Sequence, residues 1–134
     1  MYFYRMMVID YLICNRDRYG ANIEILVDQN EKARPAPIFD NGCSLLFSCY
    51  GNLKSIEKFD VMEDRAVNNF IGSRSLEYNL QLIPKRKKLF KGYLKESDKD
   101  VLLEGVESIL PFQHTEKIWN MLWKRWKYFA QICN

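Results

Sequence analysis

Apolar residues surround the axis of the first predicted helix and do not form a single stripe. Residues 2–13, YFYRMMVIDYLI, contain neither glycine nor proline. A helix that is apolar on most faces is typical of a buried helix. Asp10 lies in its second half, and a carboxylate in such surroundings needs a partner. We therefore expect a buried helix in which Asp10 is paired.

A loop, a hairpin and a turn are predicted to follow. Residues 14–22, CNRDRYGAN, contain the Asn, Asp and Gly that end helices and form loops. Residues 23–28, IEILVD, predict a short strand, and residues 35–39, PAPIF, a second extended piece, because proline pushes the residue before it out of the helical region. Two short strands around the polar turn 29–34 predict a hairpin over residues 23–39. The triplet 40–42, Asp-Asn-Gly, ends it.

The next part of the chain has weaker patterns. Residues 43–60 are expected to be irregular. Residues 61–72 carry apolar positions on a loose helical period, which predicts a helix. Residues 76–83 predict another helix, which Pro84 ends.

The last third predicts two helices. Ser97 is expected to cap the first, with Asp100 as the answering acid, and this helix is expected to run over residues 97–110. Thr115 and Glu116 are expected to open the final helix, which runs to residue 132. Its wide apolar stripe predicts packing, and it includes Trp119, Trp123 and Trp126. The fold class is therefore mainly α with a small β-hairpin (α+β).

Composition places the chain among ordinary globular proteins. Its 134 residues correspond to one domain, residues 1–134, with 48% apolar and 28% charged residues and a net charge of +3. That charge is too mild to predict nucleic-acid or membrane binding. A local basic run admits two interpretations, a solvated linker or a polyphosphate or nucleic-acid patch; it comprises Lys85, Arg86, Lys87, Lys88, Lys91 and Lys95.

The cysteine spacing and the lack of a recognisable secretory signal predict a cytoplasmic protein. The four cysteines include no close C-x-x-C pair, and His114 has no ligand type near it in sequence. We find no secretory signal and no apolar run of membrane-spanning length. We therefore expect reduced thiols and a cytoplasmic location.

Three polar residues form the candidate chemistry. Asp17 and Asn22 flank Gly20 between the buried helix and the first strand, and Asp40 follows the hairpin. Because a hairpin returns the chain, Asp40 can come back beside Asn22. Phosphoryl transfer depends on positioning and charge neutralisation. Mg²⁺ prefers hard oxygen ligands such as those of Asn22 and Asp40, and Asp17 could accept the proton of an attacking hydroxyl.

These residues resemble a kinase catalytic segment. Residues 15–22, NRDRYGAN, look like the loop H-R-D-x-x-x-x-N, with Asn15 in the histidine position. They are also similar to the D-R-H-x-x-N loop of phosphoinositide-type and HipA-like kinases, with Tyr19 replacing histidine. Residues 40–42 resemble the D-F-G triplet, with Asn41 replacing phenylalanine. The order of IDYL, NRDR, hairpin and PIFD is most similar to the HipA-like serine/threonine kinases.

The resemblance implies a role for each site residue. Asp17 would orient the acceptor hydroxyl, and Asn22 and Asp40 would hold Mg²⁺ with ATP. Arg18, assigned with Asp17 to the catalytic group, or Arg16 would steady the loop or a phosphate. Asp10 would brace the loop from the helix. The implied fold is the helical C-lobe of a protein-kinase-like protein, and the implied acceptor is a protein Ser or Thr hydroxyl.

One part of the family's pattern is missing. No G-x-G-x-x-G is present, and only sixteen residues precede Asp17, so we expect a lobe that is incomplete alone and lacks the N-lobe. A partner chain bearing an N-lobe, self-association, and cover by the C-terminal helix all remain open. The alternatives in function are a non-catalytic interaction module that keeps a kinase-like fold, a metal nuclease using Asp17 and Asp40, and a purely structural polar loop.

Overall fold

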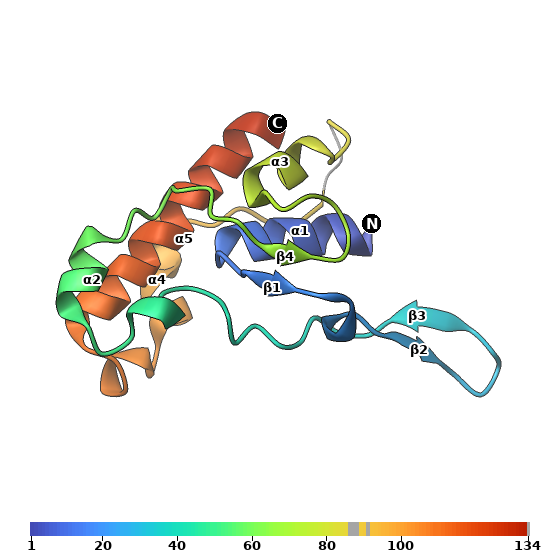
Figure 1. Cartoon of the computed structure of the whole chain (residues 1–134), viewed down its shortest axis with the longest axis horizontal. Helices are drawn as coiled ribbons and strands as arrows, with labels where there is room; N and C mark the ends of the chain where they lie inside the picture. Colours follow the sequence, from blue (N-terminus) through green and yellow to red (C-terminus); the bar gives the residue numbers. More distant parts are fainter. Residues whose placement is uncertain (86–88, 91, 134) are drawn as a thin grey trace.

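The computed structural model describes residues 1–85, 89–90 and 92–133, and this part is mainly helical with two small sheets (Figure 1). This confirms the expectation of a mainly α protein with little β-structure. The helices are α1 Tyr2–Leu12, α2 Leu53–Lys58, α3 Leu76–Gln81, α4 Lys99–Leu103 and α5 Phe112–Cys133. The strands are β1 Asp17–Arg18, β2 Ile25–Val27, β3 Ala33–Pro35 and β4 Asn68–Asn69.

The core lies between α1 and α5. Helix α1 packs against both α3 and α5, while α2 and α4 pack against α5 from other sides. This arrangement follows from the sequence, because α1 is apolar on most faces and α5 carries a wide apolar stripe. Trp119 is buried in the core. Trp123 and Trp126 are partly buried and pack against the same core, which confirms their predicted packing role. The most buried apolar side chains are Val8, Met121, Ile56, Leu76 and Leu80.

The hairpin forms, but its second strand comes earlier than predicted. Strand β2 pairs antiparallel with β3 in the register Ile25↔Pro35 and Val27↔Ala33, so β3 ends where the expected strand 35–39 would begin. Asp28 explains the shift. Its Oδ1 accepts hydrogen bonds from the backbone N–H of Asn30 and of Lys32, which closes a tight turn before Ala33. The hairpin projects away from the helices (Figure 1).

The helix predicted over residues 61–72 is wrong. This segment is extended and contains β4, which pairs parallel with β1 in the register Asp17↔Asn68. The N–H of Asn68 donates to the Arg16 carbonyl at 2.9 Å, and the N–H of Phe70 donates to the Arg18 carbonyl at 3.0 Å. The segment forms these long-range hydrogen bonds instead of a helix, because tertiary contacts outweigh a weak local preference for helix.

Gly72 turns the chain back toward α3. Its φ is +95°, and a Cβ there would lie 2.5 Å from Asn79 Oδ1, so no other residue fits without rearrangement. Helix α3 then begins at Leu76, with the Ser75 hydroxyl accepting a bond from the Tyr78 N–H at 2.8 Å. The helix expected over residues 76–83 is therefore confirmed, although it ends slightly earlier.

Residues 43–60, expected to be irregular, contain a regular helix. Helix α2 occupies Leu53–Lys58, and Asn52 caps it by accepting a bond from the Ser55 N–H at 3.0 Å. A 3₁₀ turn, Phe47–Cys49, precedes it. The prediction missed this helix because it is short and its one fully buried residue is Ile56.

The helix predicted over residues 97–110 is much shorter. A 3₁₀ turn, Glu96–Asp98, precedes it, and Asp98 closes this turn by accepting a bond from the Lys95 N–H at 2.8 Å, so Ser97 lies inside the turn and does not cap the helix. Helix α4 ends at Leu103, because Gly105 adopts a φ of +78° that a helix cannot contain.

Helix α5 starts earlier than expected. It begins at Phe112, directly after Pro111, instead of at Thr115. A proline immediately before the first helical turn is tolerated because the first N–H groups of a helix have no helical partner.

Two further expectations concern surfaces. Most of the predicted basic run, Arg86, Lys87, Lys88 and Lys91, lies outside the described residues. In the described part of the chain, none of the helices is both long enough and apolar enough to span a membrane.

Candidate functional site

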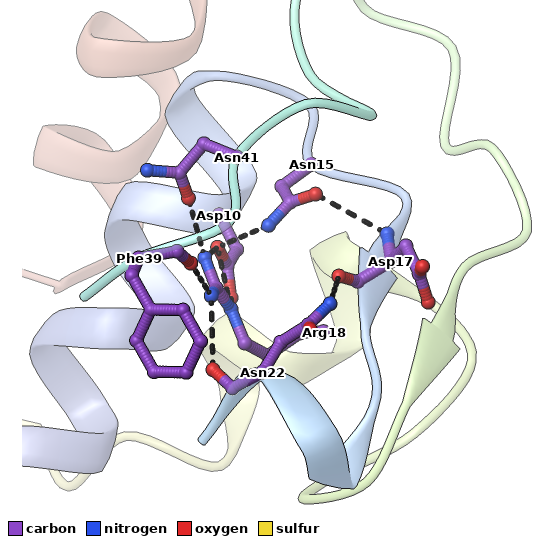
Figure 2. Close-up of polar contacts among 7 residues, drawn as sticks. All are labelled: Asp10, Asn15, Asp17, Arg18, Asn22, Phe39 and Asn41. Carbon is purple, nitrogen blue, oxygen red and sulfur yellow. Dashed lines mark hydrogen bonds and ion pairs between the residues drawn. The ribbon is translucent and has the colours of Figure 1, made fainter. Parts of the chain in front are cut away.

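Arg18 is the centre of the polar cluster at the end of α1 (Figure 2). It is 1% exposed, and its Nη2 lies 2.7 Å from Asp10 Oδ1 in a buried ion pair. Nη1 donates to the Phe39 carbonyl at 2.6 Å and to the Asn22 carbonyl at 3.3 Å. Nη2 also donates to Asn41 Oδ1 at 2.6 Å. One guanidinium therefore joins helix α1, the end of the loop 14–22 and the Asp-Asn-Gly turn.

Asn15 connects the ion pair to Asp17. Its side chain is fully buried, and its Nδ2 donates to Asp10 Oδ1 at 3.0 Å. Its Oδ1 accepts a bond from the Asp17 N–H at 3.2 Å. An amide that accepts on one side and donates on the other suits this place, because it satisfies a buried carboxylate and a loop N–H together. Asn15 thus fixes the backbone that carries Asp17.

The Asp17 carboxylate faces away from this buried cluster. In Figure 2 it points to the opposite side of its backbone from the Arg18 guanidinium. Its Oδ1 accepts a bond from Asn68 Nδ2 at 3.0 Å, across the β1–β4 pair. Asp17 is half-buried, whereas Asn68 is exposed. The carboxylate is thus accessible and is held from a strand far along the chain.

Asn22 folds back toward Asp17. Its Nδ2 donates to the Asp17 carbonyl at 3.1 Å, while its own carbonyl accepts from Arg18. The side chain is half-buried, and its oxygen is of the type that Mg²⁺ prefers. The loop from Asp17 to Asn22 is therefore closed at both ends by hydrogen bonds.

Asp40 lies between two residues that Arg18 holds. Phe39 and Asn41 both bond the guanidinium, so the backbone on each side of Asp40 is fixed beside Asn22. Asp40 is exposed, and its φ of +50° is a left-handed conformation that Asp tolerates better than most residues. A Cβ at Gly42 would lie 3.7 Å from Asp40 Oδ1, which places this carboxylate over Gly42.

Three residues near the site have a left-handed backbone conformation. Besides Asp40, Cys14 and Leu45 have φ values of 52° and 57°. The Leu45 N–H donates to the Ile13 carbonyl at 2.6 Å, and the Arg16 N–H donates to the Cys43 carbonyl at 3.0 Å. Residues 43–45 therefore lie alongside the start of the loop and are hydrogen-bonded to it. Such conformations persist only where surrounding contacts determine them, and they concentrate at functional sites.

The donor set suits a weakly held, hydrated cation better than a closed metal centre. Among the described residues, no group of three or more His, Cys, Asp or Glu side chains is arranged to hold a metal. Of the three predicted site residues, Asn22 and Asp40 lie on segments that Arg18 holds together, whereas the Asp17 carboxylate points to the other side of its backbone. One carboxylate and one amide oxygen suit Mg²⁺, which keeps several waters and needs only one or two protein carboxylates.

Two residues of the site were not found by sequence reasoning. Asn68 and Phe70 lie in the segment predicted as helix, and they contact Asp17 and Gly20 respectively. A Cβ at Gly20 would lie 3.2 Å from the Phe70 ring, so that ring packs on the loop while remaining 68% exposed. The pair Asn68-Asn69 was a usable signal, because asparagine is a poor helix former.

The chain matches no protein-family model, no curated protein and no solved structure.

Proposed function

We propose that this chain is the catalytic lobe of a HipA-like kinase that transfers a phosphoryl group from MgATP to a hydroxyl of a protein Ser or Thr. One observation carries the proposal. A single nitrogen, Arg18 Nη1, bonds the carbonyls of both Asn22 and Phe39, so the end of the D-x-x-x-x-N loop and the start of the D-x-G turn lie side by side. If the loop and the turn only capped neighbouring elements, a shared hydrogen-bond donor between them would not be required.

The accessible polar side chains then divide the chemistry. Asp17 accepts the proton of the attacking hydroxyl and orients that oxygen. Asn22 and Asp40 would hold Mg²⁺, which would supply charge neutralisation at the phosphates. Arg18 is a positioning residue, because it is buried and its contacts are with the protein. Asp10 and Asn15 support it from α1 and from the start of the loop.

The proposed lobe depends on a phosphate-binding lobe. Residues 1–134 contain no glycine-rich phosphate loop, so we infer that residues 1–134 alone transfer phosphate poorly. Efficient phosphorylation of any acceptor by this polypeptide alone, abolished by Asp17→Ala, would contradict that part of the proposal.

A non-catalytic interaction module is the second candidate. The exposed apolar strand β2 favours it, because Ile25, Leu26 and Val27 are all exposed on the projecting hairpin. An exposed apolar strand suits a binding partner and needs no catalytic residues. Metal binding separates the two candidates, because a module that only binds a partner has no use for Asn22 and Asp40 as ligands.

The test uses Mn²⁺ as a paramagnetic substitute for Mg²⁺ in NMR spectra of the ¹⁵N-labelled chain with ATP. We expect low Mn²⁺ concentrations to broaden the amide signals of Asn22, Asn41 and Gly42, and excess Mg²⁺ to restore them. Asp40→Asn should abolish this broadening. Asp28→Asn is the matched control, since Asp28 is an exposed turn aspartate on the hairpin, away from the site. Broadening that persists in Asp40→Asn would contradict the proposed function.

A further inference from the structure

We infer that Asn68 is a positioning residue that holds the Asp17 carboxylate in one orientation for proton acceptance. This inference rests on the proposed function, since it assigns Asn68 a part in the same reaction. Asn68 Nδ2 donates to Asp17 Oδ1 at 3.0 Å, although the two residues are 51 positions apart in the sequence. The motif that surrounds Asp17 contains no counterpart of this contact.

The backbone fixes the place from which Asn68 donates. Asp17 and Asn68 are direct partners in the parallel β1–β4 pair, so their side chains leave the pair on the same face. The N–H groups of Asn68 and Phe70 bond the carbonyls of Arg16 and Arg18, on the two sides of Asp17. The amide is therefore presented by a strand that is bonded to the same loop, and its position does not depend on a flexible segment.

The neighbouring asparagine has a different task. Asn69 Nδ2 donates to the Ser73 carbonyl at 2.9 Å and closes the turn after β4. Successive side chains of a strand point to opposite faces, which explains why one asparagine reaches Asp17 and the next does not. Asn69 therefore supplies a control of the same residue type, on the same strand, without the contact to Asp17.

A neutral amide suits an orienting role beside a base. A carboxylate has two oxygens, and a hydrogen bond to Oδ1 leaves Oδ2 for the acceptor hydroxyl. A lysine or arginine at this place would favour the charged carboxylate and oppose its protonation. A neutral amide fixes the direction of a carboxylate while favouring its charged form less strongly than a cation would. The reacting oxygens must be aligned closely for efficient transfer, because small misplacements cost large factors in rate.

The first test measures the orientation of Asp17 without metal or nucleotide. Three-bond couplings between the Asp17 carboxyl carbon and its backbone nitrogen and carbonyl carbon report the χ1 angle. We expect one χ1 conformer in the unmodified chain and in Asn69→Ala, and averaging over conformers in Asn68→Ala. Slow amide exchange at residues 68 and 70 should persist in Asn68→Ala, which would show that the strand pair is intact. A single χ1 conformer in Asn68→Ala, or averaging already in the unmodified chain, would overturn the inference.

Asn68→Asp separates the hydrogen bond from the shape of the side chain. It keeps the size of asparagine but replaces the donor with a second carboxylate. We expect the Asp17 carboxylate to turn away in this variant, so its χ1 couplings should change while the amide signals of α1 and α5 stay in place. Unchanged couplings in Asn68→Asp would also overturn the inference.

A second readout applies to turnover of MgATP when a separately expressed lobe with a glycine-rich phosphate loop is supplied, since residues 1–134 alone are expected to transfer phosphate poorly. We expect Asn68→Ala to lower kcat about tenfold, a part of the 10²–10⁴-fold that a positioned base contributes, with the KM for MgATP unchanged. An unchanged kcat in Asn68→Ala would contradict the catalytic part of the inference. Failure of the proposed function looks different: the Mn²⁺ broadening would not depend on Asp40, whereas the Asp17 couplings would still depend on Asn68.

Discussion

Asp10 and Arg18 form an ion pair that is almost completely shielded from solvent, with the two side chains 4% and 2% exposed. Asp10 comes from the buried helix α1, and Arg18 comes from the loop that follows it. The pair therefore transmits the position of a rigid helix to the loop that carries Asp17. Because Arg18 also bonds Asn22, Phe39 and Asn41, the same contact determines where the Asp-Asn-Gly turn lies.

Removing Arg18 should unfold the site. In Arg18→Met the Asp10 carboxylate loses its partner, and breaking a buried pair in this way costs about 3–5 kcal/mol. We expect a loss of that size in the free energy of unfolding, measured by urea denaturation. Arg74→Met, at an exposed arginine, should change it by less than about 0.5 kcal/mol.

A double-mutant cycle with Asp10→Leu isolates the pair itself. Arg18→Met combined with Asp10→Leu removes both charges of the pair and leaves neither one buried without its partner, so the two losses should not add. We expect an interaction energy above about 0.5 kcal/mol between the two positions. Strict additivity would show that Arg18 acts through its carbonyl contacts and not through Asp10.

Arg125 on α5 has a comparable role in the core. It is 1% exposed, and its guanidinium donates to the carbonyls of Val61, Tyr11 and Glu63 at 2.7, 2.9 and 2.9 Å. Arg125→Met would leave these carbonyls without the donor, and the bonds to Val61 and Tyr11 are buried. We expect a loss of about 3 kcal/mol or more in the free energy of unfolding.

Lys124→Met is the control for Arg125→Met, since Lys124 is the adjacent residue of α5 and is exposed. It should be nearly neutral, within about 0.5 kcal/mol. Equal stability of the two variants in urea would show that the Arg125 bonds are replaced by water. Because residues 61–63 lead into β4, Arg125→Met should also speed amide exchange at Asn68.

The elements that sequence predicts well are those determined locally. Helix α1 follows from a continuous apolar segment, and the hairpin follows from turn residues between β-branched ones. The need of Asp10 for a partner also followed from burial alone. The identity of that partner as Arg18 required the fold, because the loop turns back on the helix from which it emerges.

The errors arise where distant segments pair. Residues 61–72 have a loose helical period, yet Asn68 and Asn69 form strand β4 because the N–H groups of Asn68 and Phe70 bond the carbonyls of Arg16 and Arg18. No local property of Asn68 indicates that it meets Asp17. The helix predicted over residues 97–110 is too long for a local reason, because the left-handed Gly105 cannot continue α4.

Alkaline pH should destabilise the chain through Tyr11. Burial raises the pKa of Tyr11 well above its ordinary value of 10.0, although the nearby Arg125 opposes this. The unfolded chain therefore loses this proton above pH 10 while the folded chain keeps it. The free energy of unfolding therefore keeps the full contribution of the neutral Tyr11 below the pKa that Tyr11 has in the unfolded chain. Above that pKa the free energy of unfolding declines by at most about 1.4 kcal/mol per pH unit.

Urea denaturation between pH 9 and pH 11 measures this effect. Tyr11→Phe should flatten the decline, since phenylalanine does not titrate. Tyr128 should contribute in the same direction, because its hydrogen bond to Glu77 raises its pKa. Tyr93→Phe is the control, at a tyrosine that is 65% exposed. An equal decline in Tyr11→Phe and in the unmodified chain would contradict the prediction.

The hairpin is the surface that we expect to bind a partner. Ile25 and Val27 point to one face of β2 and are 54% and 64% exposed, while α1 is covered by α3 and α5. An isolated two-stranded hairpin is marginal in water, and adjacent exposed aliphatic side chains favour burial against another surface. We therefore expect the double variant Ile25→Thr, Val27→Thr to reduce hydrophobic-dye binding and self-association in light scattering. Threonine keeps the β-branched shape, so the strand itself should persist.

The matched control changes the same residue types elsewhere. Val101 and Ile109 are 75% and 77% exposed on the helical part of the chain, so Val101→Thr with Ile109→Thr removes similar apolar surface away from the hairpin. If surface apolarity in general causes association, both double variants will reduce it equally. If the hairpin is the interface, only the first will. A strict monomer at high concentration that binds no dye would contradict the interface. The packing of α3 and α5 on α1 would then cover enough apolar surface without a partner. If the chain does associate, adding a separately expressed lobe that carries a glycine-rich phosphate loop should compete with self-association, and Ile25→Thr with Val27→Thr should weaken both contacts together.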